Sequence, residues 1–195
     1  MSHFNARVLG AFPIVLMAPI GIWNSAEVHS LRGAASDTME VIVDVVNDRP
    51  TNSSPEVQAF LDTIAWAEGA DYDVIVGGEN FSDFSKHPGE FRKAFGVVSS
   101  AAGRYQFIDT TWEAMAKKEG LTDFTPESQD KAAIALLKEI GALDEIKSGD
   151  IDAAICSAGG QWASFPCNDW GQNPKTTSKI REYYDNRLKE LQDDQ

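Results

Sequence analysis

Helix start and stop signals recur from Ser54 to the end of the sequence, and they leave little room for an extended sheet. Ser54 followed by Pro55 is typical of a helix N-terminus, because serine caps free backbone N–H groups and proline is tolerated at the first helical position. The same kind of signal predicts helices at 55–68, from 109 or 110 to 119, from 125 to about 140, briefly after 150, and from about 178 onward.

A small β-hairpin is predicted directly after the first of these helices. The segments YDVIV at 72–76 and NFSDF at 80–84 flank Gly77-Gly78-Glu79, a sequence that favours a tight turn. The chain is therefore expected to belong to the α+β class, mainly helical with a small sheet.

The first quarter of the chain differs from the rest. Arg7 is followed by residues 8–26, which include no charged residue and end in the small residues Ser25 and Ala26. This pattern favours a cleaved secretory signal, with an uncleaved membrane anchor or a buried helix as alternatives. We predict three parts: a signal-like or membrane-associated segment at 1–26, a linker at 27–54 and one folded domain at 55–195.

The charge balance argues against nucleic acid as a partner. The sequence has 30 acidic against 17 basic side chains, a formal net charge of -13, and no basic run. Affinity for a polyphosphate requires clustered lysine and arginine. His3, His29 and His87 have no partner at ligand spacing, so we expect neither a metal nor another cofactor.

Glu68 stands out because it continues the apolar face of the first helix. Phe60, Leu61 and Ile64 lie on that face at helical spacing, and Glu68 follows four positions after Ile64, just before Gly69. Burial and the negative end of the helix dipole both raise a carboxyl pKa, and a raised pKa suits a general acid. The alternative is that the side chain bends outward into water.

Cys156 and Cys167 are close enough in sequence to close a small loop if the domain reaches an oxidising compartment. Two separate buried thiols are the alternative.

Five motifs follow one another from the end of the first helix to the region before the last one. In order, they are Glu68-Gly69, YDVIVGG at 72–78, Gly103-Arg104-Tyr105-Gln106, Gln161-Trp162-Ala163-Ser164 and Trp170-Gly171-Gln172. This series resembles the bacteriophage lambda endolysin family, which comprises lysozyme-like lytic transglycosylases. The resemblance extends from about Val57 to the last helix.

The resemblance implies a lysozyme-like fold and glycan strands of peptidoglycan as substrate. It implies that Glu68 protonates the oxygen between N-acetylmuramic acid and N-acetylglucosamine, and then acts as base on the C6 hydroxyl to give a 1,6-anhydro end. An intramolecular hydroxyl removes the need for the second carboxylate of ordinary glycosidases. The expected substrate-binding residues are Tyr72, Tyr105, Gln106, Trp162, Trp170 and Gln172. For each aromatic ring, core packing is the alternative.

Two other functions remain open at this point. A hydrolytic muramidase would need a second carboxylate, for which Asp71, Asp73, Glu79 and Asp83 are candidates, although turn or surface positions are their ordinary roles. A non-catalytic wall-binding or virion module is the other. Only Ala70 and Asp71 separate Glu68-Gly69 from Tyr72, where relatives carry a longer loop, so the lip of the substrate cleft is expected to be more open.

The N-terminal segment decides the expected location. If residues 8–26 act in export, the domain reaches the periplasm and cell wall by itself, with transient association with the inner membrane. Without export, the resemblance implies a host-cytoplasmic protein that waits for membrane permeabilisation. We expect a monomer, because no exposed apolar heptad is visible after the N-terminal segment.

Overall fold

The computed structural model describes residues 53–94, 96–171 and 174–194. The N-terminal segment at 1–26, nearly all of the linker at 27–54, and Gln172 lie outside the described residues. None of the helices within these ranges has the length and apolar character needed to cross a membrane.

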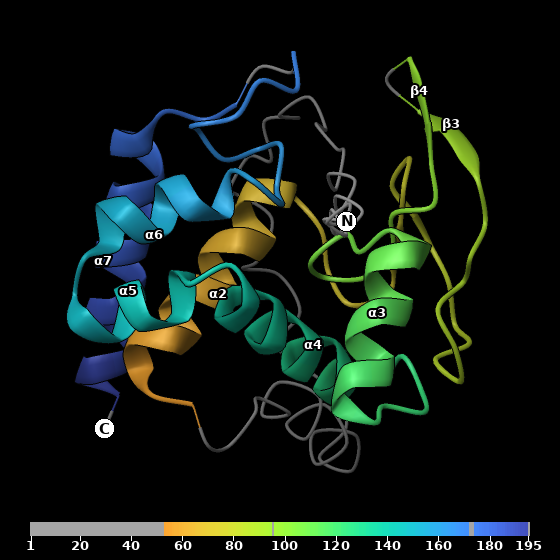
Figure 1. Cartoon of the computed structure of the whole chain (residues 1–195), viewed down its shortest axis with the longest axis horizontal. Coiled ribbons are helices and arrows are strands. Elements are labelled where there is room, and N and C mark those ends of the chain that lie inside the picture. The colour runs from red at the N-terminus through yellow and green to blue at the C-terminus, as the bar shows by residue number, and fades with distance from the viewer. Residues whose placement is uncertain (1–52, 95, 172–173, 195) are drawn as a thin grey trace, which may run out of the picture.

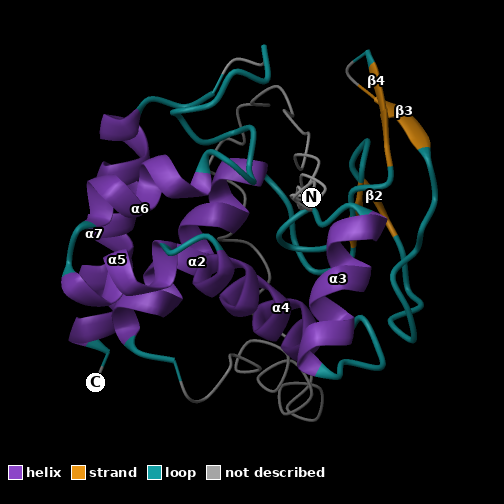
Figure 2. Cartoon of the chain, viewed as in Figure 1, coloured by secondary structure: helices purple, strands orange, loops and turns teal. Residues whose placement is uncertain are grey.

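The described chain is mainly helical, as predicted, with two small antiparallel hairpins (Figure 2). Its elements in order are α2 (Pro55–Glu68), β1 (Val74–Ile75), β2 (Glu79–Asn80), β3 (Arg92–Ala94), β4 (Val97–Ser99), α3 (Asp109–Glu119), α4 (Pro126–Glu139), α5 (Ala142–Ser148), α6 (Ile151–Ala158) and α7 (Thr177–Asp193).

Helix α2 is the central element of the core. Its side chains are buried on almost every side, which is the pattern of a helix enclosed by others rather than one lying on a surface. It packs most extensively against α7 and also contacts α4 and α5. Figure 1 shows α5, α6 and α7 on one side of α2, and α3 with the hairpins on the other.

Local signals fix the ends of α2. Ser54 occupies the N-cap position with Pro55 after it, as predicted, although the Ser54 side chain makes no capping hydrogen bond. At the other end Gly69 adopts a left-handed conformation (φ 66°) and its N–H donates to Ala65 O. Glycine adopts this conformation without strain, so α2 ends directly after Glu68.

Helix α7 covers α2 with one apolar face. Ile180, Tyr184 and Leu191 are buried on this face, at the spacing of one side of a helix. The ring of Tyr184 meets the ring of Phe60 on α2 edge to face, with centroids 6.1 Å apart. The C-terminal helix therefore closes the core around the helix that carries Glu68.

The predicted hairpin is present but shorter than expected. Strands β1 and β2 pair in the register Val74↔Asn80 and Ile75↔Glu79, with Gly77 and Gly78 both at positive φ in the turn. The second hairpin, β3 with β4, and helix α5 were not predicted. Gly141, directly after the helix predicted from 125 to about 140, is the N-cap residue of α5.

Candidate active site

Glu68 is the last residue of α2, and its side chain turns inward. Its exposed fraction is 3 %, so the structure selects the buried position over the alternative in which the side chain bends into water. The following residue, Gly69, is exposed. The carboxyl group therefore lies just beneath the surface, at the point where the chain leaves the core.

Burial dominates the chemistry of the Glu68 carboxyl. It raises the pKa from 4.5 to about 8, while a hydrogen bond from Ser164 and the positive charge of Lys175 act in the opposite direction. Glu68 is therefore mostly protonated at neutral pH. A neutral acid in that pH range is what proton donation to a glycosidic oxygen requires.

The two carboxyl oxygens of Glu68 differ in their surroundings. Oε1 accepts a hydrogen bond from the Ser164 hydroxyl at 2.5 Å. Oε2 is buried and has no hydrogen-bond partner among the described residues. Since Oε1 acts as the acceptor, the proton of the neutral acid belongs on Oε2, where no described protein group accepts it.

Ser164 is positioned by a tightly folded segment between α6 and α7. Gly159 has no room for a side chain, because a Cβ there would lie 1.8 Å from Pro166 O. The indole Nε1 of Trp162 donates to Tyr105 O at 3.1 Å, which ties this segment to the loop at 103–106. Cys156 and Cys167 form a disulfide across the same segment, with their Cα atoms 5.1 Å apart.

The loop at 103–106 is held against β1. Gly103 N donates to Val74 O at 2.8 Å, and a Cβ on Gly103 would come within 2.2 Å of the Gln129 side chain. Gln106 adopts a positive φ of 48°, and its amide donates to Val74 O (3.1 Å) and Gly103 O (2.8 Å). The Gln106 side chain thus stabilises the turn that carries it.

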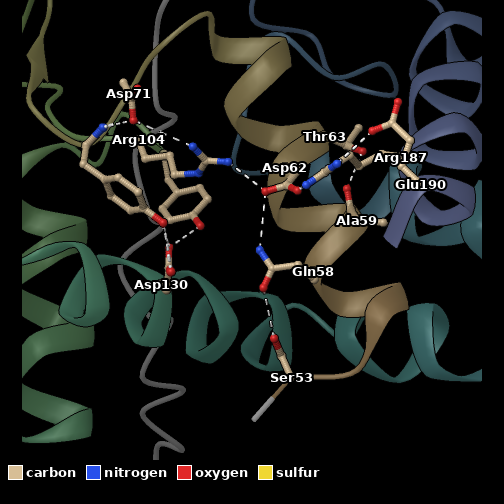
Figure 3. Close-up of polar contacts among 12 residues, drawn as sticks. Ser53, Gln58, Ala59, Asp62, Thr63, Asp71, Arg104, Asp130, Arg187 and Glu190 are labelled. Carbon is tan, nitrogen blue, oxygen red and sulfur yellow. Dashed lines mark hydrogen bonds and ion pairs between the residues drawn. The ribbon is translucent and has the colours of Figure 1, made fainter. Parts of the chain in front are cut away.

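A buried polar cluster links this loop to α4 (Figure 3). The hydroxyls of Tyr72 and Tyr105 both donate to the carboxylate of Asp130 on α4. Burial raises the pKa of Asp130 to about 6, against the hydrogen bonds from the two tyrosines, which lower it. Burial and the Asp130 charge together raise the pKa of Tyr72 far above its usual value, so the phenol stays protonated and remains a donor.

A second buried carboxylate, Asp62, joins the cluster to α7. Asp62 Oδ1 pairs with Arg104 Nη2 at 2.7 Å, and its Oδ2 pairs with Arg187 Nε at 2.7 Å (Figure 3). The Arg104 guanidinium also lies over the Tyr72 ring, 5.0 Å from its centroid. Both oxygens of Asp62 are therefore engaged, which leaves this acid no free oxygen for proton transfer.

The predicted substrate-binding residues differ in accessibility. Tyr105 and Trp162 are completely buried and belong to the core, so in this conformation their rings offer no surface for stacking on a sugar. Gln106 is also buried, and Tyr72 is partly buried. Of the five that the structure describes, Trp170 is exposed, with 40 % of its surface accessible and its Nε1 donating to Gly159 O at 3.2 Å.

The four candidate second carboxylates lie near the surface or in turns. Glu79 and Asp83 are exposed: Glu79 pairs with Arg92, and Asp83 accepts from Ser85 N at 2.9 Å. Asp71 is exposed and accepts from Tyr72 N at 2.8 Å, whereas Asp73 is partly buried. Within the described ranges, no group of three or more His, Cys, Asp or Glu side chains could hold a metal ion.

Ser164 and Lys175 are site residues that the sequence did not single out. Ser164 belonged to a recognised motif but carried no assigned role, and Lys175 follows Pro174 with no pattern that sets it apart. Their sequence separations from their α2 partners, Glu68 and Ala67, are 96 and 108 residues. No local periodicity could have placed them there.

Comparison with known proteins gives consistent matches. A family model described as Endolysin matches residues 58–191. The endolysin of Escherichia phage lambda is 46 % identical over 129 residues, which covers 59 % of this chain and 80 % of the relative. The endolysin of Escherichia phage P2 is 40 % identical over 149 residues, which covers 66 % and 90 %.

Solved structures agree with these sequence matches. Bacteriophage lambda lysozyme complexed with a chitohexasaccharide aligns with a TM-score of 0.67 and 38 % identity, covering 70 % of this chain and 96 % of that chain. A second structure, lysozyme from bacteriophage lambda, aligns with a TM-score of 0.60 and 36 % identity, covering 73 % and 96 %.

Proposed function

Because this chain belongs to the endolysin family, we propose that it cleaves the glycan strands of peptidoglycan as a lytic transglycosylase. The bond cleaved is the β-1,4 bond between N-acetylmuramic acid and N-acetylglucosamine. The family resemblance and the lysozyme-like fold, both predicted from the sequence, are confirmed by the matches to the phage endolysins and to lambda lysozyme.

The state of Glu68 carries the proposal. Its carboxyl is buried, its pKa is raised to about 8, and its Oε2 has no hydrogen-bond partner among the described residues. A wall-binding module would gain nothing from a buried acid, since burying a polar group without a partner destabilises the fold. A general acid needs this arrangement, because it must hold a proton at neutral pH and release it to the substrate.

The proposed reaction uses this one carboxyl group twice. Glu68 first donates its proton to the bridging oxygen, the bond from that oxygen to C1 of the muramic acid breaks, and N-acetylglucosamine leaves with a free hydroxyl. The C6 hydroxyl of the same muramic acid then attacks C1, and its proton passes to the Glu68 carboxylate. The acid is regenerated, no water is consumed, and the strand ends in a 1,6-anhydro ring.

The placement of the other acids favours this route over hydrolysis. A hydrolytic muramidase needs a second carboxylate facing the acid across the sugar. Of the four candidates, Glu79 is bound to Arg92, and Asp71 and Asp83 hydrogen-bond to nearby backbone in exposed turns. Asp73 is the member of the set for which no side-chain partner is described, and it is the residue to examine if hydrolysis is observed.

The proposed substrate class is supported by the sugar backbone that chitin oligomers and peptidoglycan share. The matched lambda lysozyme was complexed with a chitohexasaccharide, an oligomer of β-1,4-linked N-acetylglucosamine. Peptidoglycan has the same linkage with a lactyl ether on alternate sugars. A protein with a net charge of -13 gains no general attraction to an anionic envelope, so recognition of the sugar backbone itself is required.

Mass spectrometry of soluble fragments distinguishes the two reactions. The full chain is incubated with purified peptidoglycan, with Glu68→Gln as the control. Fragments one water lighter than hydrolysis products, with no end that borohydride reduces, are expected from the wild type and are absent from the variant. Reducible ends would instead identify a muramidase, and fragments of either kind released by Glu68→Gln would refute the role of Glu68.

We also propose that residues 1–26 direct export of the domain to the periplasm. The support is the uncharged stretch 8–26 after Arg7, together with the disulfide between Cys156 and Cys167, a bond typical of oxidising compartments. Alkaline phosphatase, which is active only after export, is fused behind residue 50 as the test. Active fusions are expected, whereas activity no higher than that of a fusion lacking residues 1–26 would refute export.

A further inference from the structure

Lys175 reaches the end of α2 that carries Glu68, although it comes from the connection between α6 and α7. Its Nζ donates to Ala67 O at 2.7 Å and lies over the Trp66 ring, 5.1 Å from the centroid. Its backbone N–H donates to Ser164 O at 2.9 Å, and the Ser164 hydroxyl donates to Glu68. One residue therefore contacts both the helix end that bears the acid and the residue that binds it.

The Lys175 ammonium group supplies the positive charge that the last turn of α2 lacks. The last carbonyl groups of a helix carry partial negative charge and need donors, and a basic side chain in the last turn commonly supplies them. The last turn of α2 contains no basic residue. Lys175 provides this cation from a distant part of the chain, next to the buried carboxyl.

The charge of Lys175 opposes the effect of burial on Glu68. Burial favours the neutral acid, whereas a neighbouring positive charge favours the carboxylate. The interaction is mutual: burial lowers the pKa of Lys175, and the negative charge of Glu68 opposes this effect. Lys179, at the start of α7, is the other charged side chain acting on this pair among the described residues, and it acts on Lys175.

We propose that Lys175 is a positioning residue for Glu68, which fixes the end of α2 and stabilises the carboxylate that forms each time the acid gives up its proton. This inference rests on the proposed function, in which Glu68 alternates between acid and base. A buried carboxyl without a compensating charge would hold its proton too strongly to donate it. Lys175 therefore lets one group serve in both steps.

Three variants separate charge from packing. Lys175→Met removes the charge and the donor but keeps an unbranched side chain, Lys175→Arg retains the charge, and Lys189→Met removes an exposed charge farther along α7 as the matched control. In chains labelled with 13C-glutamate, NMR follows the titration of the Glu68 carboxyl carbon, whose signal is identified by its absence in Glu68→Gln. Release of peptidoglycan fragments gives kcat and KM across pH for the same proteins.

Lys175→Met is expected to move the titration of Glu68 upward by about one pH unit. It should lower kcat with little change in KM, since the binding surface is unaltered, and Lys175→Arg should restore both the titration and kcat. Lys189→Met should leave kcat unchanged. The proposal is overturned if Glu68 titrates at the same pH in the wild type and Lys175→Met, or if Lys175→Arg behaves like Lys175→Met.

The role of Lys175 can still be tested if the first variant does not fold. If Lys175→Met fails to fold, Lys175→Gln replaces it, because its amide retains a donor for the end of α2 without the charge. The outcome is also distinguishable from failure of the proposed function. If the wild type releases no fragments, the proposed function fails, whereas the NMR titration still decides whether Lys175 controls Glu68.

Discussion

Replacing Glu68 with glutamine should stabilise the protein at neutral pH while abolishing its activity. In the unfolded chain the glutamate loses its proton near pH 4.5, but in the folded chain it keeps the proton up to about pH 8. A group whose pKa is raised on folding contributes stability that is fully present below its unfolded pKa and is lost as the pH rises to the folded pKa. Glutamine has nearly the same shape and still accepts from Ser164, but it has no proton to lose, so the variant does not lose this stability as the pH rises.

The size of the effect follows from the interval between the two pKa values. At about 1.4 kcal/mol per pH unit, the interval from 4.5 to pH 7 corresponds to about 3 kcal/mol in the free energy of unfolding. For a domain of this size that is about 10 °C in Tm at pH 7. At pH 4 the two proteins should melt together, because glutamate is then protonated in both states.

Thermal unfolding followed by circular dichroism from pH 4 to pH 8 tests this. Glu119→Gln is the matched control: Glu119 is also the last residue of its helix, α3, and also precedes a left-handed glycine, Gly120, but it is exposed. The control separates burial from position at a helix end and should shift Tm little at any pH. A gain for Glu68→Gln that is the same at pH 4 and pH 7, or a loss at pH 7, would refute the reasoning.

Three further predictions concern stability. Asp62→Asn should lower the free energy of unfolding, measured by urea denaturation, by about 3 kcal/mol, because it leaves two arginines without their buried partner. The exposed control Asp71→Asn should lower it by under about 1 kcal/mol. Similar losses in the two variants would contradict the role of Asp62 as a buried ion-pair partner. Reducing the disulfide between Cys156 and Cys167, 11 residues apart, should cost about 2–3 kcal/mol, visible as a lower Tm in dithiothreitol, and an unchanged Tm would count against it. Burial lowers the pKa of His87, so the stability that this residue contributes is present above pH 6.5 and is lost as the pH falls. Glu68 acts equally in both proteins, so the difference in Tm between the wild type and His87→Gln should shift against the wild type from pH 7 to pH 5. A difference that stays constant over this interval would argue against the linkage.

The parts of the fold that depend on local chemistry were predictable from the sequence. Capping residues and left-handed glycines act within one turn of the chain. Both ends of α2, and the end of α3 before Gly120, could therefore be predicted from neighbouring residues. Helical spacing placed Glu68 on the apolar face of α2, but the alternative of a side chain bent outward into water stayed open until the structure showed the carboxyl group buried. The hairpin of β3 and β4 gave no such signal, because the consecutive exposed residues Val97 and Val98 break the alternation that marks a strand with one buried face.

The remainder of the site depends on contacts between distant residues. Asp62 meets Arg104 and Arg187 across 42 and 125 residues, distances over which the sequence carries no pattern. The burial of the aromatic residues could not be predicted from the sequence either. The motifs that contain Tyr105 and Trp162 are specific, but only the packed structure shows that these rings lie in the core while Trp170 is exposed.

Helix α2 also sets the distance between the point where the chain enters it and the acid at its other end. Whatever precedes Pro55 joins the helix at one end, while Glu68 lies at the other, 14 residues along. At 1.5 Å per residue the two points are about 20 Å apart along a rigid rod. A label or linker attached at Ser54, directly before the helix, would therefore lie about 20 Å from the end of α2 that carries the acid.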